Sequence, residues 1–405
     1  MRTTIGTVAL LLILVLPLAA QPGVPAKLKL KGDPAQDLDL GATRLVPMPV
    51  RKGPKGPVVS SPYVCLRSTE SGLQTGGAAK PRQLLGRPAS SVMPWLNRLD
   101  KMKPSLIWSQ RWTLVCFLKD ARVDDLTPEE TVRLRVYFPK LPSRPTRLTG
   151  HERAHLWAIR MLRTESGVAD LLDLDERGEL KSRGPGYRPL PHKGCELYMF
   201  SSAATHDAFR RHIFKPSTKG LAGETLDSGP VTAMLMDDQK SAPIRRRFLH
   251  AASLQLIRAH RRLEGGIPAW LEIGVAHYFE RRQSKVNRFR KDESGTLPPG
   301  LESPRDWDQA IRDLVAAGRS GELTALSATP ERGLTVNSRL QSWSLVKYLL
   351  GVDGRRFRRL LVELLHTRPG TTVQDGLRAA LKASYGHFPK DVEKAWKSWV
   401  IKRGG

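Results

Sequence analysis

A zinc-binding pattern stands at the start of a long helical stretch. His151 and His155 are four residues apart, with Glu152 between them, in the sequence His-Glu-Arg-Ala-His. On a helix such histidines share one face and can bind one Zn²⁺, while the intervening carboxylate activates a metal-bound water. The acidic residues downstream that would have to supply a third ligand are Glu165, Asp170, Asp173, Glu176 and Glu179. The pattern makes a zinc-dependent hydrolase the first function to consider.

The surroundings of this motif favour a structural helix start instead. Arg153 places a cation between the two histidines, and the downstream acids do not lie in an apolar helix. A glutamate in the first turn also interacts favourably with the helix dipole. We therefore expect no metal at His151 and His155 and no catalysis by Glu152. An active zinc hydrolase that uses these three residues is kept as the alternative.

A second stretch, from His250 to Glu280, carries a more extensive pattern. His250 is followed by Ala-Ala-Ser-Leu-Gln-Leu, and further on the chain reads Pro-Ala-Trp-Leu-Glu-Ile-Gly-Val-Ala-His-Tyr-Phe-Glu, ending at Glu280. These segments resemble the gluzincin zinc peptidases of the peptidase-MA-like group. That family carries HExxH on one helix and P-x-W-L-x-E-G-x-A-x-Y-x-E on the next. The resemblance covers roughly residues 146–402 and includes a Gln-Ser-Trp-x-Leu-Val segment at 341–346.

The resemblance also shows which chemical groups are missing. The family's first zinc ligand corresponds to His250, its general base to Ala251, its second histidine to Leu254 and its third ligand to Ile273. Only the first of these is kept. Glu272 is adjacent to the third-ligand position, but one residue along a helix turns a side chain by about 100°. The packing residues of the motif are all present: Pro268, Trp270, Leu271, Gly274, Ala276, Tyr278 and Phe279.

The resemblance therefore implies a catalytically inactive peptidase-like protein, a pseudoenzyme with a binding or structural role. No cofactor is expected at the altered positions, and zinc belongs only to the alternative. A peptide in the former substrate cleft is one candidate ligand. His260 and His277 could form a different site with His250, but three histidines without helical pairing are more typical of ordinary surface or core residues.

The hydrophobic pattern predicts an α+β fold: a small mixed region over 61–145, then a zincin-like α+β domain over 146–290 with a short sheet and two central helices, then an all-helical part over 300–405. The expected strands are 63–66, 112–118, 196–200 and 231–236, and 132–138 is left open between strand and helix. The expected helices are 150–172, 244–262, 269–282, 305–317, 338–350, 354–367, 371–383 and 389–402.

The N-terminus predicts export. Residues 1–20 combine Arg2, a charge-free apolar run and a small-residue ending, as a cleavable signal peptide does, and residues 21–60 form a proline-rich linker. No later run is long and apolar enough to span a bilayer. Three cysteines, Cys65, Cys116 and Cys195, lie in strand-like runs without metal-ligand spacing. We expect one disulfide and one buried thiol among them.

The charge predicts attraction to polyanions. Lys and Arg number 66 against 39 Asp and Glu, a formal charge of +27. An acidic polymer or an anionic cell-surface component is the expected class of partner, and specific nucleic-acid binding is not expected because no recognition motif is present. The densest basic cluster, a candidate contact for such a polymer, is Arg281, Arg282, Lys285, Arg288, Arg290 and Lys291.

Overall fold

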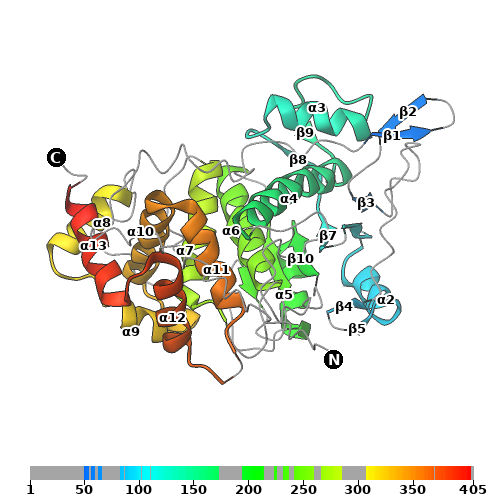
Figure 1. Cartoon of the computed structure of the whole chain (residues 1–405). Helices are drawn as coiled ribbons and strands as arrows, with labels where there is room; N and C mark the ends of the chain where they lie inside the picture. Colours follow the sequence, from blue (N-terminus) through cyan, green and yellow to red (C-terminus); the bar gives the residue numbers. More distant parts are fainter. Residues whose placement is uncertain are drawn as a thin grey trace, which may run out of the picture.

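The chain folds into a mixed α+β structure with one main sheet among many helices, as a computed structural model shows (Figure 1). This confirms the α+β class. The structure describes residues 50–53, 56–59, 63–65, 83–85, 87–101, 103–109, 111–172, 194–213, 223–225, 231–236, 241–259, 266–284, 307–368 and 370–402. The expected signal peptide lies outside these residues. Within them, no helix has the length and apolar character needed to cross a membrane.

Regular structure begins inside the segment expected to be a linker. Strands β1 (Val50–Gly53) and β2 (Gly56–Val59) pair as an antiparallel hairpin. A second hairpin pairs β4 (Gln83–Leu84) with β5 (Arg87–Pro88), and a short bridge pairs β8 (Ala121–Arg122) with β9 (Arg147–Leu148). These pairs flank the main sheet without joining it.

The main sheet has six strands. Three of them, which are adjacent in the sheet, run parallel to one another. In spatial order the strands are β11 (Gly223–Thr225), β12 (Val231–Leu235), β10 (Cys195–Phe200), β7 (Trp112–Phe117), β6 (Ser105–Trp108) and β3 (Val64–Cys65). β7 and β10 pair directly, with Val115 opposite Tyr198. The boundary expected at residue 146 therefore does not separate two sheets, because strands from both sides of it hydrogen-bond to each other.

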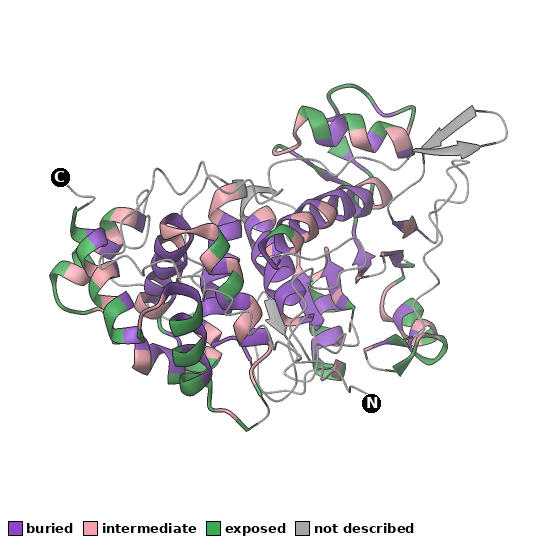
Figure 2. Cartoon of the chain, viewed as in Figure 1, coloured by how far each residue is buried: buried purple, intermediate pink, exposed green. Residues whose placement is uncertain are grey.

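Both faces of this sheet are covered, which explains why its central strands are mostly apolar. Successive side chains of a strand point to opposite faces. Leu114 and Cys116 join the core formed with α4 (Gly150–Leu172) and α6 (Ser241–Ala259). Val115 and Phe117 join a second core with α2 (Ala89–Leu99) and α5 (Ala203–Ile213). Figure 2 shows these central strands as buried.

Helix α3 (Pro128–Tyr137) decides the choice that the sequence left open at 132–138. The hydroxyl of Thr127 accepts a hydrogen bond from the Glu130 backbone N–H, and the Glu130 carboxylate accepts one from the Thr127 backbone N–H. This reciprocal capping box, followed by proline at the first helical position, starts a helix strongly. It prevails over the alternating apolar pattern, and Val132 is accordingly exposed.

The C-terminal part is helical, as expected. Its elements are α7 (Ala269–Ser284), α8 (Trp307–Ala316), α9 (Leu323–Ala328), the 3₁₀ turn η2 (Glu331–Gly333), α10 (Val336–Val352), α11 (Gly354–Leu365), α12 (Val373–Tyr385) and α13 (Pro389–Lys402). α7 packs against α6 on one side and α10 on the other. The predicted helices are confirmed to within a few residues at their ends, and the short α9 was not predicted.

The prediction of a disulfide was wrong. Cys65, Cys116 and Cys195 are all free and buried, and they lie on β3, β7 and β10. Burial raises the pKa values of the Cys116 and Cys195 thiols well above their ordinary range. Thiols held neutral in this way pack as small apolar side chains.

Gly274 allows the close contact between α7 and α10. A methyl group built on this glycine would lie 2.5 Å from the backbone oxygen of Ser342 and 2.8 Å from a side-chain carbon of Val346. We expect Gly274→Ala to lower the free energy of unfolding by about 1–3 kcal/mol, because the two helices must move apart. Chemical denaturation measures this change.

Gly321→Ala is the matched control. Its added methyl would meet only the Gln341 side chain, at an ordinary contact distance of 3.7 Å. We expect this variant to unfold within about 0.5 kcal/mol of the parent. Equal stability of both variants and the parent would contradict the proposed close contact at Gly274.

Candidate functional site

Helices α6 and α7 bring together the four positions that the peptidase resemblance assigns to metal chemistry. His250, Ala251 and Leu254 lie on α6, and Ile273 lies on α7. All four are buried, and Ala251, Leu254 and Ile273 belong to the main apolar core. α6 is fixed beneath the sheet by Gln255, whose side-chain amide donates to the Thr232 hydroxyl on β12 at 2.7 Å. The positions for a base and for two further ligands are therefore occupied by packed hydrocarbon.

Glu272, next to the third-ligand position, has a different task. Its carboxylate accepts a hydrogen bond from the Arg258 guanidinium of α6 at 3.1 Å. Arg258 also pairs with Glu331 on η2. This agrees with the expectation that Glu272 faces away from the Ile273 position. The Arg258 guanidinium thus links the buried Glu272 to the partly exposed Glu331, and these ion pairs join α6, α7 and η2.

The surviving His250 meets two groups from α7. Its Nδ1 lies 3.4 Å from the Glu280 Oε2, and the His277 Nδ1 lies 3.0 Å from the same oxygen. All three side chains are buried, and their ligand atoms fall within 4.8 Å of one another. The sequence named His250 and His277 together with His260, which lies outside the described residues. Glu280 was missed, although its i, i+3 spacing from His277 on one helix was a usable signal.

The His-Glu-Arg-Ala-His motif begins α4, as expected. The Thr149 backbone N–H donates to the Glu152 carboxylate at 2.7 Å, and the Thr149 hydroxyl accepts from the Glu152 N–H at 3.3 Å. Glu152 is thus half of a capping box. Arg153 points to the end of β7, where it donates to the backbone oxygen of Lys119. The one carboxylate of the motif is bound to the helix cap.

The two histidines of the motif meet a cysteine that is distant in sequence. The Cys65 Sγ on β3 lies 3.4 Å from the His151 Nε2, and the ligand atoms of Cys65, His151 and His155 all fall within 4.8 Å of one another. His155 is 0% exposed, and its Nδ1 is 2.9 Å from the Tyr63 hydroxyl. Burial, and secondarily the neighbouring His151, lowers the pKa of His155 to about 3. This imidazole is therefore neutral throughout the physiological range.

Among the acids that the sequence offered as a third ligand, Glu165 is described in detail and lies away from the histidines. Glu165 pairs with Arg111 at 3.3 Å and accepts a hydrogen bond from the Trp112 indole at 2.7 Å. It lies ten residues beyond His155 on α4, about 15 Å along the helix axis. Asp173, Glu176 and Glu179 lie outside the described residues. Glu165, one of the acids that the sequence offered as a third ligand, is therefore held elsewhere, and the structure places a thiol near the histidines.

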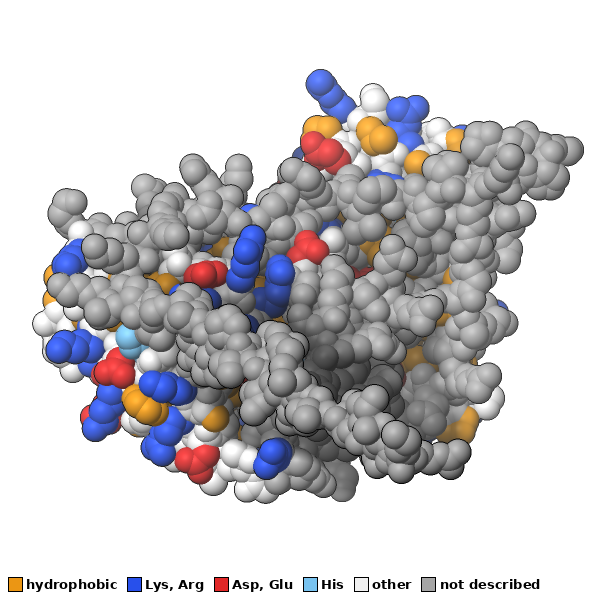
Figure 3. Space-filling view, in the orientation of Figure 1, with side chains coloured by type: hydrophobic (Ala, Val, Ile, Leu, Met, Phe, Trp, Pro, Cys, Tyr) orange, Lys and Arg blue, Asp and Glu red, His pale blue; other side chains and the backbone are white. Residues whose placement is uncertain are grey.

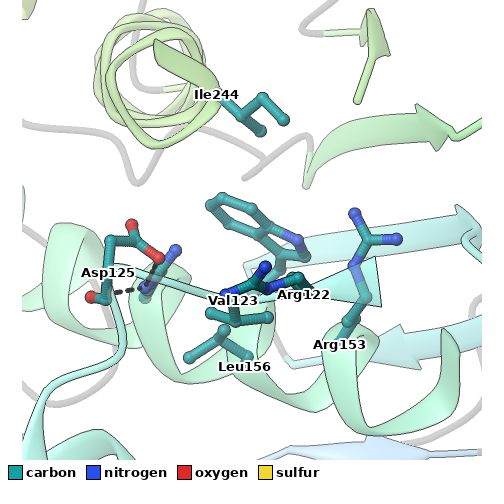
Figure 4. Close-up of a pocket in the computed structure, with 8 residues that line it drawn as sticks. Arg122, Val123, Asp125, Arg153, Leu156 and Ile244 are labelled. Atoms are coloured by element: carbon teal, nitrogen blue, oxygen red, sulfur yellow. Dashed lines mark hydrogen bonds and ion pairs between the residues drawn. The ribbon is translucent and has the colours of Figure 1, made fainter. Parts of the chain in front are cut away.

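A small pocket lies between α4 and α6 (Figure 4). Its volume of about 20 Å³ suffices for about one water molecule. Arg160, part of its lining, is 2% exposed and pairs with Glu130 at 3.0 Å and Asp125 at 3.1 Å. Burial alone would lower the pKa of Arg160, but these two carboxylates raise it above its ordinary value. The pocket is part of a buried charge network and is too small for a peptide or polymer.

Two members of the basic cluster at 281–291 are described. The Arg281 guanidinium lies over two indole rings, 4.4 Å from the centre of Trp307 and 4.3 Å from that of Trp343. It is therefore a packing cation. Arg282 lies within 3.4 Å of the Tyr278 hydroxyl. The remaining members, Lys285, Arg288, Arg290 and Lys291, lie outside the described residues.

Basic side chains also occur elsewhere on the surface. Figure 3 shows Lys and Arg side chains over the C-terminal helices and over α3, with acidic side chains among them. Among the exposed or partly exposed ion pairs are Arg359 with Glu363 and Arg378 with Asp375. Such pairs neutralise part of the positive charge locally.

The chain matches no protein-family model, and no curated protein matches it at a significant level.

Trp270 tests whether the α6–α7 segment is maintained for packing. Its ring is 0% exposed, and its indole N–H donates to the Ser327 hydroxyl at 3.0 Å. We expect Trp270→Ala to lower the free energy of unfolding by about 3–5 kcal/mol, because a large cavity is left. Trp270→Phe keeps most of the packed volume and should cost clearly less. An alanine variant that melts at the parent temperature would contradict a packing role.

Proposed function

We propose that this chain is an exported, catalytically inactive peptidase-like protein with a binding or structural role. On this proposal the sheet and the helix pair α6–α7 form a zincin-like scaffold, and the helical C-terminal part packs behind it. The supporting residues are those of the Pro-x-Trp-Leu motif, because Trp270, Leu271 and Phe279 are buried and Gly274 permits close helix packing. The proposal assigns the Pro-x-Trp-Leu segment and the residues that follow it a structural role.

The observation that carries the loss of activity is the burial of Leu254 and Ile273. These side chains are 4% and 0% exposed and lie in the core at the positions where the family would hold its second and third zinc ligands. Neither side chain can bind a metal, and Ala251 cannot take a proton from water. His250 is instead paired with Glu280. A hydrolytic zinc centre of the family's type needs three protein ligands and an open position, and this one has a single histidine left.

The alternative, an active zinc hydrolase at residues 151–155, is disfavoured because its general base, Glu152, is bound to the helix cap. Hydrolysis requires the glutamate of the motif to face a metal-bound water. The Glu152 carboxylate is held by the Thr149 backbone N–H at the start of α4.

The test is a search for metal-dependent peptide cleavage. We expect the purified chain, with Zn²⁺ supplied, to cleave neither casein nor a mixed fluorogenic peptide library in a chelator-sensitive way. His250→Ala and Glu152→Gln should give the same background. Chelator-sensitive turnover lost in His250→Ala would overturn the proposal. Turnover lost only in Glu152→Gln would establish the alternative.

Binding to a polyanion is the proposed interaction that the charge supports. The net charge is +27, or +26 after loss of Arg2 with the signal peptide. We expect retention on a heparin column that moderate salt reverses, because such attraction is screened over about 8 Å at physiological ionic strength. The loop variant should change Arg282, Lys285, Arg288, Arg290 and Lys291 to Gln or Ser.

Arg281 is left unchanged in this variant because its stacking between Trp307 and Trp343 would be lost. A matched control changes five basic residues of α11 and α12: Arg355, Arg358, Arg359, Arg378 and Lys382. We expect the loop variant to elute at lower salt than this control. Equal elution of both would assign the attraction to the overall charge and remove the loop from the proposal.

A further inference from the structure

The group formed by Cys65, His151 and His155 is independent of the α6–α7 pair and of the proposed function. One residue comes from β3 at the edge of the sheet, and the two histidines come from the first turns of α4. The sequence offered only downstream carboxylates as a third ligand for His151 and His155. Cys65 was not a candidate, because it is 86 residues from His151. With the thiol of Cys65 included, the group offers three metal ligands: one sulfur and two imidazole nitrogens.

We propose that Cys65, His151 and His155 form a zinc site that ties β3 to α4 and takes no part in hydrolysis. A thiolate with two imidazoles is a ligand set typical of Zn²⁺, and helix positions i and i+4 are the usual way to aim two histidines at one ion. The third donor comes from another element, as in most protein zinc sites. One coordination position is left for water.

The spacing of the donor atoms suits the ion. With Zn–S near 2.3 Å and Zn–N near 2.0–2.1 Å, a tetrahedral angle places sulfur and nitrogen about 3.6 Å apart. The Cys65 Sγ and His151 Nε2 are 3.4 Å apart. The ring centres of His151 and His155 are 5.0 Å apart. Small side-chain rotations therefore bring all three donors to one centre without moving the backbone elements.

The surroundings hold the ligands in place. The Tyr63 hydroxyl contacts the Nδ1 of His155, and such a contact fixes a ligand ring and leaves its other nitrogen for the metal. Phe138 packs its edge against both histidine rings. His151 is only partly buried, so the ion can enter from its side.

The non-catalytic role follows from Glu152. Its carboxylate is bound within the α4 cap, so no base of the motif is directed at the coordinated water. The ion would stabilise the fold. Within the described residues β3 has two residues and pairs only with β6, so a metal-mediated link from Cys65 to α4 would hold this edge of the sheet in place.

The experiment is metal binding by the metal-stripped, reduced chain. Co²⁺ is the probe, because a cobalt–thiolate bond gives an intense near-ultraviolet charge-transfer band, and Zn²⁺ is then titrated in competition. We expect one ion per chain and a band that is absent in Cys65→Ser. His151→Ala should weaken Zn²⁺ affinity at least tenfold. Zn²⁺ should also raise the melting temperature of the parent and not that of Cys65→Ser.

The second histidine-rich group supplies the control. His277→Gln removes a donor from the His250, His277 and Glu280 group and should leave the Co²⁺ band and the stoichiometry unchanged. The proposal is overturned if the parent shows no thiolate band, or if binding survives Cys65→Ser and is lost in His277→Gln. Zinc-dependent peptide cleavage lost in Glu152→Gln would overturn the non-catalytic role while leaving the site. Cleavage lost in His250→Ala alone would overturn the proposed function and not this site.

Discussion

The buried pair between Glu130 and Arg160 is the interaction on which the arrangement of the helices most depends. Glu130 is 0% exposed, caps α3 and binds Arg160 of α4, while Arg245 of α6 approaches the same carboxylate at 3.9 Å. One acidic group therefore sets the positions of three helices. Isolated buried charges are costly, and removing one partner of such a pair typically costs about 3–5 kcal/mol. His151 and His155 lie on α4 and His250 lies on α6, two of these three helices.

On the proposed function, the helix pair α6–α7 has lost a catalytic centre and kept its framework. The close backbone contact at Gly274 joins α7 to α10, and the Trp270 indole donates to Ser327 of α9, and neither contact depends on a metal. When packing alone holds the helices, burying unpaired polar ligands between them costs desolvation free energy. Leu254 and Ile273 remove that cost. The polar groups that remain, His250 and Glu280, contact each other at 3.4 Å.

Local periodicity predicted most helices of this chain, because each signal lies within one element. The strand-like alternation over 132–138 left the choice between strand and helix open, because it competed with the helix-start signal of Thr127 and Glu130, whose capping box forms in the structure. The candidate sites were harder to predict. Cys65 meets His151 only because β3 joins the far edge of a sheet completed by much later strands. No spacing rule reports a contact of that kind. The disulfide prediction was based on the number of cysteines alone, which does not tell whether two of them meet.

The three free thiols have a consequence for how this protein comes apart. They lie on β3, β7 and β10, from the edge of the sheet to its centre, and each is shielded from solvent. An alkylating reagent reaches each one only when its own strand separates from its neighbours. The order in which the cysteines become labelled is therefore a record of the order in which the sheet opens. In the metal-free chain we expect the fastest labelling at Cys65, because β3 is the shortest strand of the main sheet and lies at its edge.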